Sequence, residues 1–73
     1  VIIYTKDNKV NVHATVDIED VTIFDMLGRK LFAAEDIHAV DFKTADFNTS
    51  TEALIVKVKL SNQSVVTRKI ILE

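Results

Sequence analysis

Histidines and clustered carboxylates are the side chains in this sequence whose types and spacing could support chemistry. The chain has two histidines, His13 and His38, and no cysteine. A protein metal site usually needs three or four ligands of these types, so their small number favours a structural or surface role for both histidines. Asp17, Glu19 and Asp20 are close enough in sequence to face a calcium ion, but they lack the alternating ligands, the glycine and the later bidentate glutamate of a calcium-binding loop. We therefore expect a solvated acidic turn there.

Nucleophilic and acid–base catalysis find little support in the remaining polar residues. Ser50, Ser61 and Ser64 lie in polar, turn-like stretches without the glycine-flanked elbow or the nearby histidine base that activates a serine. Two carboxylates acting on a glycosidic bond would need a cleft, and a chain of 73 residues has little room for one. We expect a protein that is not an enzyme and that has no metal ion and no other cofactor.

Composition is that of a small folded domain, with 48% hydrophobic and 27% charged residues. The net charge is -2, which gives no attraction to phosphate backbones or anionic lipid. Nucleic acid is therefore not an expected partner. No apolar run approaches the roughly 20 residues that span a bilayer, and the first residues, VIIYTKDNK, lack the order of a signal peptide. Because the chain starts without methionine, on residues with strand character, we expect residues 1–73 to be one domain cut from a larger polypeptide.

Alternating apolar and polar residues run through most of the chain and predict strands with one buried face. The clearest strand runs from Leu54 to Leu60 and places Lys57 and Lys59 towards solvent. Val65 to Leu72 has the β-branched content of a half-buried strand. The residues expected on buried faces are Val10, Val12, Ala14, Val16, Leu54, Val56, Val58 and Leu60. No stretch has a helical period, so the sequence predicts an all-β fold.

Short turn segments separate these strands, and this regular spacing is typical of a sandwich or barrel. Ala45 to Thr51 is the longest polar stretch and is expected to form a surface loop, with Phe42 or Phe47 holding it to the core. The expected turns are Lys6-Asp7-Asn8-Lys9, Asp17-Ile18-Glu19-Asp20, Asp25-Met26-Leu27-Gly28 and Leu60-Ser61-Asn62-Gln63-Ser64.

The turn Asp25-Met26-Leu27-Gly28 has the most specific local mechanism. An aspartate at the first position of a type I turn accepts a hydrogen bond from the backbone two residues later, and a glycine at the fourth position adopts the left-handed conformation that closes a bulged hairpin. Gly28 is the single glycine of the chain, which indicates that this position requires a positive φ. The residues on either side of the turn are expected to pair as strands.

Basic residues near the end of the chain allow two interpretations. Lys57, Lys59, Arg68 and Lys69 could line up on adjacent strands as a basic face that a partner reads. Lysines on exposed or edge strands also discourage aggregation, and this second interpretation is the favoured one.

Residues 21 to 31, VTIFDMLGRKL, resemble the V-x-[IV]-[YF]-D-x-x-G-[RK]-x-[LV] hallmark of the C-terminal sorting domains of type IX secretion cargo in Bacteroidetes. The closing residues Val66 to Leu72 resemble the terminal K-[IV]-[IV] strand of the same family. The resemblance covers about the whole chain. Glu52-Ala53-Leu54 and Asn62-Gln63 depart from the Gly-x-Tyr and Asn-Gly of many type A members, so the subtype is either type A-like or the flavobacterial type C.

This resemblance implies a small immunoglobulin-like β-sandwich of about seven antiparallel strands. It also implies a C-terminal domain of a larger secreted protein, recognised by the type IX outer-membrane translocon and removed by a sortase-like peptidase. The attached N-terminal cargo domain would then pass through the periplasm and across the outer membrane to the cell surface or the medium.

By residue, the resemblance assigns Asp25 and Gly28 to the structural turn and makes other residues candidates for recognition. These candidates are Arg29, Lys30, Lys69, Ile70, Ile71 and Leu72. A turn and an exposed strand edge can be read through shape and main-chain hydrogen bonds, and unpaired edges also allow a weak edge-strand dimer beside the monomer. The alternative function is an immunoglobulin-like accessory module that binds carbohydrate or protein.

Overall fold

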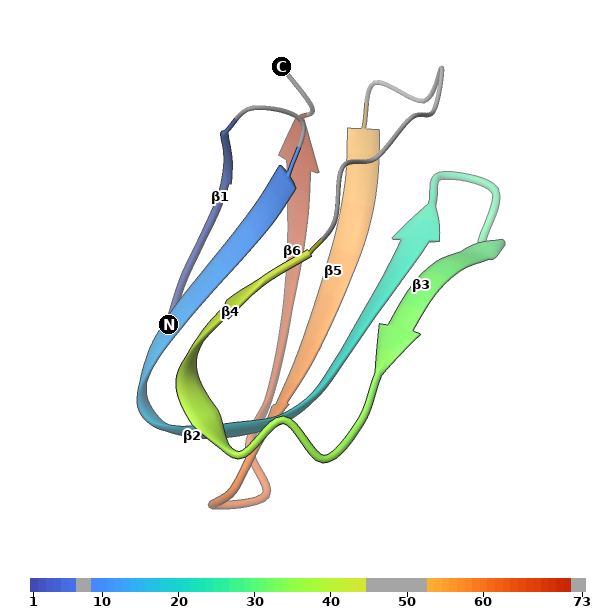
Figure 1. The fold of residues 1–73 in the computed structure, drawn as a ribbon. Coiled ribbons are helices and arrows are strands. Elements are labelled where there is room, and N and C mark those ends of the chain that lie inside the picture. Colours follow the sequence, from blue (N-terminus) through green and yellow to red (C-terminus); the bar gives the residue numbers. More distant parts are fainter. Residues whose placement is uncertain (7–8, 45–52, 72–73) are drawn as a thin grey trace.

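Antiparallel strands make up most of the described chain. The computed structural model describes residues 1–6, 9–44 and 53–71. Its six strands form one curled sheet (Figure 1), which confirms the expected all-β class. They are β1 (Ile2–Lys6), β2 (Lys9–Asp25), β3 (Lys30–Ala34), β4 (Ala39–Lys43), β5 (Ala53–Leu60) and β6 (Val65–Ile71).

The long strand β2 organises the sheet. Its first half pairs with β1 and β4, and its second half pairs with β3 and β5. β6 then pairs with β5 on the side away from β2. In Figure 1, β2 descends on one side of the molecule, crosses the bottom and rises on the other side, so that the sheet curls around its own inner face.

The turn predicted at Asp17-Ile18-Glu19-Asp20 is wrong, because β2 continues through it. The backbone oxygens of this segment are used inside the fold: Asp17 O accepts from Ser61 N, Ile18 O from His38 N, and Glu19 O from Ile37 N. The pairing registers of β2 shift here, as at a β-bulge, which bends a strand without ending it. The acidic residues therefore mark a bend at which β2 changes partners.

This bend also accounts for the number of strands. The alternation predicts separate strands before and after Asp17–Asp20, and the resemblance to sorting domains implies about seven strands in two sheets. In the described ranges these two strands are one, there are six strands in all, and a single curled sheet joins them.

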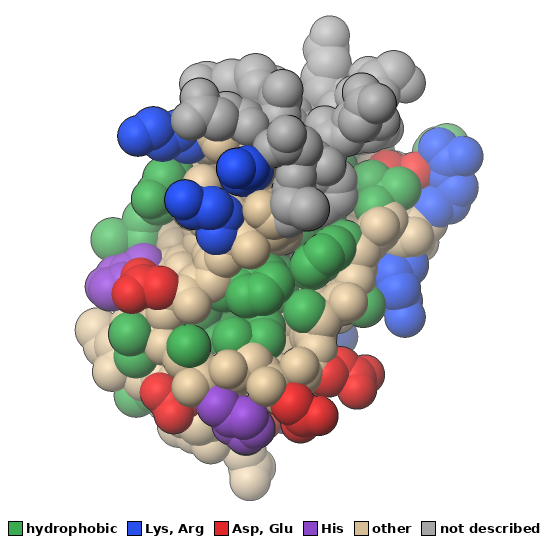
Figure 2. Space-filling view, in the orientation of Figure 1, with side chains coloured by type: hydrophobic (Ala, Val, Ile, Leu, Met, Phe, Trp, Pro, Cys, Tyr) green, Lys and Arg blue, Asp and Glu red, His purple; other side chains and the backbone are tan. Residues whose placement is uncertain are grey.

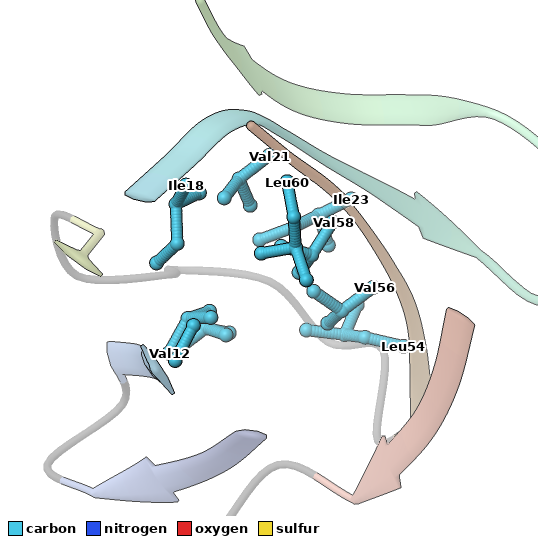
Figure 3. Packing of buried hydrophobic residues seen from close by; sticks show 10 residues of the cluster. Val12, Ile18, Val21, Ile23, Leu54, Val56, Val58 and Leu60 are labelled. Carbon is cyan, nitrogen blue, oxygen red and sulfur yellow. The ribbon is translucent and has the colours of Figure 1, made fainter. Parts of the chain in front are cut away.

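The core comes from β2 and β5 (Figure 3). Before the bend, the buried apolar positions of β2 are even-numbered, and after it they are odd-numbered, because the bulge inserts one residue into the alternation. Phe32 and Phe42 pack against this core with their ring centroids 6.0 Å apart. Phe47 and the predicted loop Ala45–Thr51 lie outside the described residues. The buried apolar residues are Val10, Val12, Ala14, Ile18, Val21, Ile23, Leu54, Val56, Val58 and Leu60.

The hairpin between β5 and β6 is confirmed. Leu60 O accepts a hydrogen bond from Gln63 N at 2.9 Å, and Asn62 Oδ1 accepts one from Ser64 N at 3.0 Å. Gln63 has a φ of 69°, so a residue other than glycine takes the left-handed position. Residues 7 and 8 of the predicted turn between β1 and β2 lie outside the described residues.

Lysines on β5 and β6 share one outer face of the sheet. Lys57 and Lys59 are exposed and alternate with buried residues, and Lys69 pairs opposite Ile55 on the same face. Arg68 pairs opposite the buried Val56 and therefore belongs to the other face. The four basic residues thus do not form one patch. The described part of the chain contains no helix that could cross a membrane.

Candidate functional site

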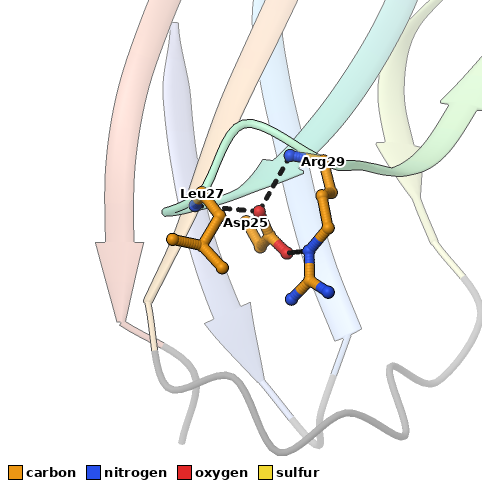
Figure 4. A network of polar contacts seen from close by, with 3 residues as sticks. All are labelled: Asp25, Leu27 and Arg29. Carbon is orange, nitrogen blue, oxygen red and sulfur yellow. Dashed lines mark hydrogen bonds and ion pairs between the residues drawn. The ribbon is translucent and has the colours of Figure 1, made fainter.

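The turn after β2 is built around the carboxylate of Asp25. Its Oδ1 accepts hydrogen bonds from the backbone nitrogens of Leu27 and Arg29, both at 2.9 Å, and its Oδ2 accepts one from Nε of Arg29 (Figure 4). The backbone oxygen of Asp25 accepts from Gly28 N at 3.1 Å, and its backbone nitrogen donates to Arg29 O. The predicted aspartate contact two residues along the turn is therefore confirmed, and Arg29 completes the arrangement.

Asp25 is buried because it continues the inward-facing series of Val21 and Ile23 along β2. Only 2% of it is exposed. Burial by itself raises the pKa of this carboxyl, but the hydrogen bonds from Arg29 and Leu27, together with the charge of Arg29, outweigh it and lower the pKa below its ordinary value. The turn therefore contains a permanently ionised, fully partnered anion at neutral pH.

Gly28 supplies the backbone conformation that the turn needs. Its φ is +85°, and a Cβ added there would meet no atom within 4 Å. The requirement is thus conformational rather than steric, and an alanine at this position would cost about 1–2 kcal/mol. The positive φ predicted for the single glycine is confirmed.

The sheet register brings this turn and the last strand to the same end of the molecule. Asp25 pairs with Leu54 on β5, and Leu54 pairs with Ile70 on β6. Neighbouring strands are about 4.8 Å apart, so the base of the turn lies about 10 Å from Ile70. In Figure 1 the hairpin between β2 and β3 and the end of β6 both lie at the top.

The side chains at this end are mostly exposed. We call it the turn–terminus surface and define it as residues 25–30 together with residues 69–71. Leu27 is 80% exposed and Ile71 is 60% exposed, whereas Ile70 packs against the core. Arg29, Lys30 and Lys69 are exposed, so the surface combines positive charge with apolar side chains. Leu72, also a predicted recognition residue, lies outside the described residues.

Sequence reasoning missed Met26 and Leu27 as members of this surface. They occupy the two central positions of a tight turn, and side chains at such positions have no neighbouring strand to cover them. Their central position in the turn was the sequence feature from which their exposure could have been predicted. Sequence reasoning also missed that Arg29, expected only as a recognition residue, is a structural partner of Asp25.

The histidines lie away from this surface. Nδ1 of His13 on β2 is hydrogen-bonded to Oδ1 of Asp41 on β4, and Nε2 of His38 is 3.9 Å from Oδ1 of Asp36. Within residues 1–6, 9–44 and 53–71, no group of three or more metal-binding side chains is close enough to hold a metal ion.

Comparison with family models gives a match over nearly the whole chain. A family described as Domain of unknown function (DUF8694) matches residues 1–72. No curated protein matches the chain.

Proposed function

The chain belongs to the family described as Domain of unknown function (DUF8694), and from the turn–terminus surface we propose that it is a non-catalytic sorting domain. In this proposal it directs an attached cargo domain through the type IX outer-membrane translocon. A sortase-like peptidase then removes it at the cell surface.

One observation carries the proposal: the two segments that resemble the sorting-domain hallmark lie at one end of the sheet. Asp25 and Ile70 are 45 residues apart in sequence, yet Asp25, Leu54 and Ile70 stand in one row across three strands. A single partner surface can therefore contact both. This arrangement suits recognition of a shape that is independent of the cargo attached to it.

The chemistry of the surface also favours recognition over catalysis. The carboxylate of Asp25 is fully occupied by hydrogen bonds within the turn, so it holds a shape and is not available as an acid or base. The groups left for a partner are exposed apolar side chains, three cations and the outer edge of β6. β6 pairs only with β5 among the described strands. Ile71 O accepts a hydrogen bond from the hydroxyl of Thr5 on β1, and the rest of the other edge of β6 can pair with an added strand.

The proposal includes an immunoglobulin-like arrangement in a reduced form. The group β1, β2 and β4 and the group β3, β2, β5 and β6 act as the two layers, and β2 belongs to both. What supports this is the bend in β2, which turns the second half of the strand away from its first partners.

A secretion assay tests the proposed function directly. Residues 1–73 are fused to the C-terminus of a periplasm-targeted reporter in a host with a working type IX system. We expect the reporter at the cell surface or in the medium, and in the periplasm of a host lacking the translocon. A reporter that stays in the periplasm of the competent host would refute the sorting role and favour the accessory-module alternative.

Two double variants then test the turn–terminus surface. Lys69→Thr with Ile71→Thr removes exposed side chains at this end while keeping strand propensity, and we expect export to fall at least tenfold. Lys59→Thr with Val65→Thr is the matched control, because these residues are also an exposed lysine and an exposed β-branched residue, paired at the opposite end of the same two strands. Equal export of the two variants would show that the end of β6 is not what the partner reads.

A further inference from the structure

The outer edge of β3 is a second place at which this molecule can bind a partner. β3 pairs with β2 alone among the described strands, and Figure 1 shows it at the right-hand border of the molecule, with β2 on its inner side. Leu31 and Ala33 are exposed. β3 has a lysine at its first position and no proline, so its centre lacks the residues that usually prevent edge strands from pairing.

The pairing of β2 with β3 shows which backbone groups of β3 point outwards. Asp25 N donates to Arg29 O, so the backbone of Asp25 points towards β3. Alternate residues of an antiparallel strand direct their N–H and C=O groups to the same neighbour, so the backbone of Ile23 also points towards β3, where its partner is Phe32. The next residue of β3, Ala33, therefore directs its N–H and C=O groups to the outer edge.

The side chains of β3 leave room for another strand at this edge. Phe32 and Ala34 lie on the inner face of the sheet, because they pair with the buried residues Ile23 and Val21. Ala33 lies between them on the outer face. Its methyl group is small enough for a second alanine to lie directly opposite it.

The charges along β3 change sign from its start to its end. Arg29 and Lys30 lie at the start, Glu35 and Asp36 follow the end, and all four are exposed. In Figure 2, basic side chains lie at the upper right margin and acidic side chains at the lower right, on either side of the position that β3 has in Figure 1. A second β3 placed antiparallel beside the first would meet opposite charges at both ends, whereas a parallel one would meet like charges.

We propose that two copies of this chain pair through β3 in an antiparallel, two-fold arrangement. Ala33 lies opposite Ala33 of the second copy, and the two alanines exchange backbone hydrogen bonds. In this register Leu31 lies opposite Glu35 of the second copy, whose carboxylate is within reach of Lys30. The two-fold axis repeats each favourable contact, which makes a second copy the occupant that fits this edge.

This inference is independent of the proposed sorting role. The sorting proposal uses the end of β6, and β3 and β6 are the two outer strands of the group β3, β2, β5 and β6. Pairing through β3 therefore leaves the edge of β6 accessible. The two proposals can fail separately, because one is tested by secretion and the other by association of the purified chain.

Sedimentation equilibrium of the 73-residue chain measures this association. Between about 10 μM and about 1 mM we expect a monomer–dimer equilibrium with a Kd on the order of 100 μM, because so short an edge buries less surface than a standard interface. A chain that stays monomeric at the highest of these concentrations overturns the proposal.

Two charge variants test the antiparallel pairing. Lys30→Glu places carboxylates side by side at both ends of the interface, and Glu35→Lys does the same with ammonium groups. Each variant alone should therefore dimerise about fivefold more weakly than the unmodified chain. The two substitutions move the net charge in opposite directions, so net charge cannot explain a loss in both.

An equal mixture of the two charge variants provides the matched control. Opposite charges meet at both ends of the mixed dimer, and we expect the mixture to regain the association of the unmodified chain. If the two variants associate equally well alone and mixed, the antiparallel pairing through β3 is wrong.

Proline variants then identify the edge. Ala33→Pro removes an N–H group that points outwards, which an edge strand tolerates, and we expect no dimer at the same concentrations. Thr67→Pro is the control on β6. Ile71 O accepts from the hydroxyl of Thr5 on β1, so by the same alternation Thr67 directs its N–H to the outer edge of β6. This variant should dimerise like the unmodified chain.

Circular dichroism establishes that both proline variants are folded. A dimer that survives in folded Ala33→Pro, or one that is lost in folded Thr67→Pro, would overturn β3 as the interface. If either proline unfolds the domain, the charge variants alone decide the outcome.

Discussion

At the scale of single residues, Asp25 is both an inward-facing residue of β2 and the charged group that holds the turn. It sits on the inward face of β2, where the preceding inward residues are apolar, yet it remains charged because the turn supplies donors to both carboxylate oxygens. A buried charge without such partners would be strongly destabilising. Ionisation of the carboxylate therefore contributes to the stability of the turn.

The lowered pKa of Asp25 has a consequence for acid stability. Because the pKa is lower in the folded state than in the unfolded state, the ionised carboxylate stabilises the fold above about pH 4, the ordinary range for aspartate, and this contribution is lost as the pH falls through the folded value. We expect Asp25→Asn to be less stable at pH 7 and to lose less stability between pH 5 and pH 2 than the unmodified chain.

Urea denaturation at a series of pH values measures both effects of Asp25→Asn. Asp36→Asn is the control, because the side chain of Asp36 is 91% exposed and Asn tolerates its positive φ. Parallel pH profiles for Asp25→Asn and the unmodified chain would contradict the assigned role of the carboxylate.

Gln63 gives a second prediction at this scale, because it holds a left-handed conformation without being glycine. That conformation costs a non-glycine residue about 1–2 kcal/mol, whereas glycine loses about 0.5–1 kcal/mol more in conformational freedom on folding. The first effect is larger, so Gln63→Gly should stabilise the domain by about 0.5 kcal/mol. The free energy of unfolding in urea tests this.

Asn62→Gly is the comparison for this hairpin. It removes the Oδ1 acceptor of Ser64 N and should destabilise the domain. If both glycine substitutions changed the free energy of unfolding in the same direction, the backbone conformation at position 63 would not be the deciding factor.

The residue-scale features were partly predictable from the sequence. The roles of Asp25 and Gly28 follow from local rules of turn chemistry, which need only the four residues of the turn. The ion pair of Asp25 with Arg29 was not predicted, because it depends on a bulged closure that points the arginine back across the turn.

At the scale of elements, the bend in β2 is the main difference between sequence and structure. Polar residues at 17, 19 and 20 are typical of a turn, and a local pattern cannot show that neighbouring strands use the backbone of this segment. One signal was present: the apolar positions change from even to odd numbers across the bend. A change of phase without glycine or proline is typical of a bulge.

Ile18 tests this description of the bend. In a solvated turn its replacement would change stability by about 0.5 kcal/mol or less. It is instead 0% exposed and part of the core, so Ile18→Ala should cost about 2–5 kcal/mol. Asp17→Ala, at the neighbouring exposed position, is the control and should change the unfolding free energy little. A small loss in the free energy of unfolding for Ile18→Ala would favour the predicted solvated turn over the buried bend.

At the scale of the whole molecule, the curled sheet brings the first and last strands together. The hydroxyl of Thr5 on β1 donates to Ile71 O on β6 at 3.0 Å, although the two strands are not paired in the sheet. The all-β class was predictable from alternation alone, which is a local property. The closure between β1 and β6 was not, because it depends on the accumulated curvature of every strand between them.

The central place of β2 also determines how the domain can unfold. β2 pairs with four of the other five described strands, so opening its second half removes the pairing partner of β3 and one of the two partners of β5 at once. No smaller cooperative unit is left that keeps a core, since every buried apolar residue in the described ranges belongs to β2 or β5. Partial opening is thereby confined to fraying of the outer strands. The loss of β2 amounts to global unfolding, so a protease or a narrow channel would meet this domain either folded, apart from frayed outer strands, or unfolded.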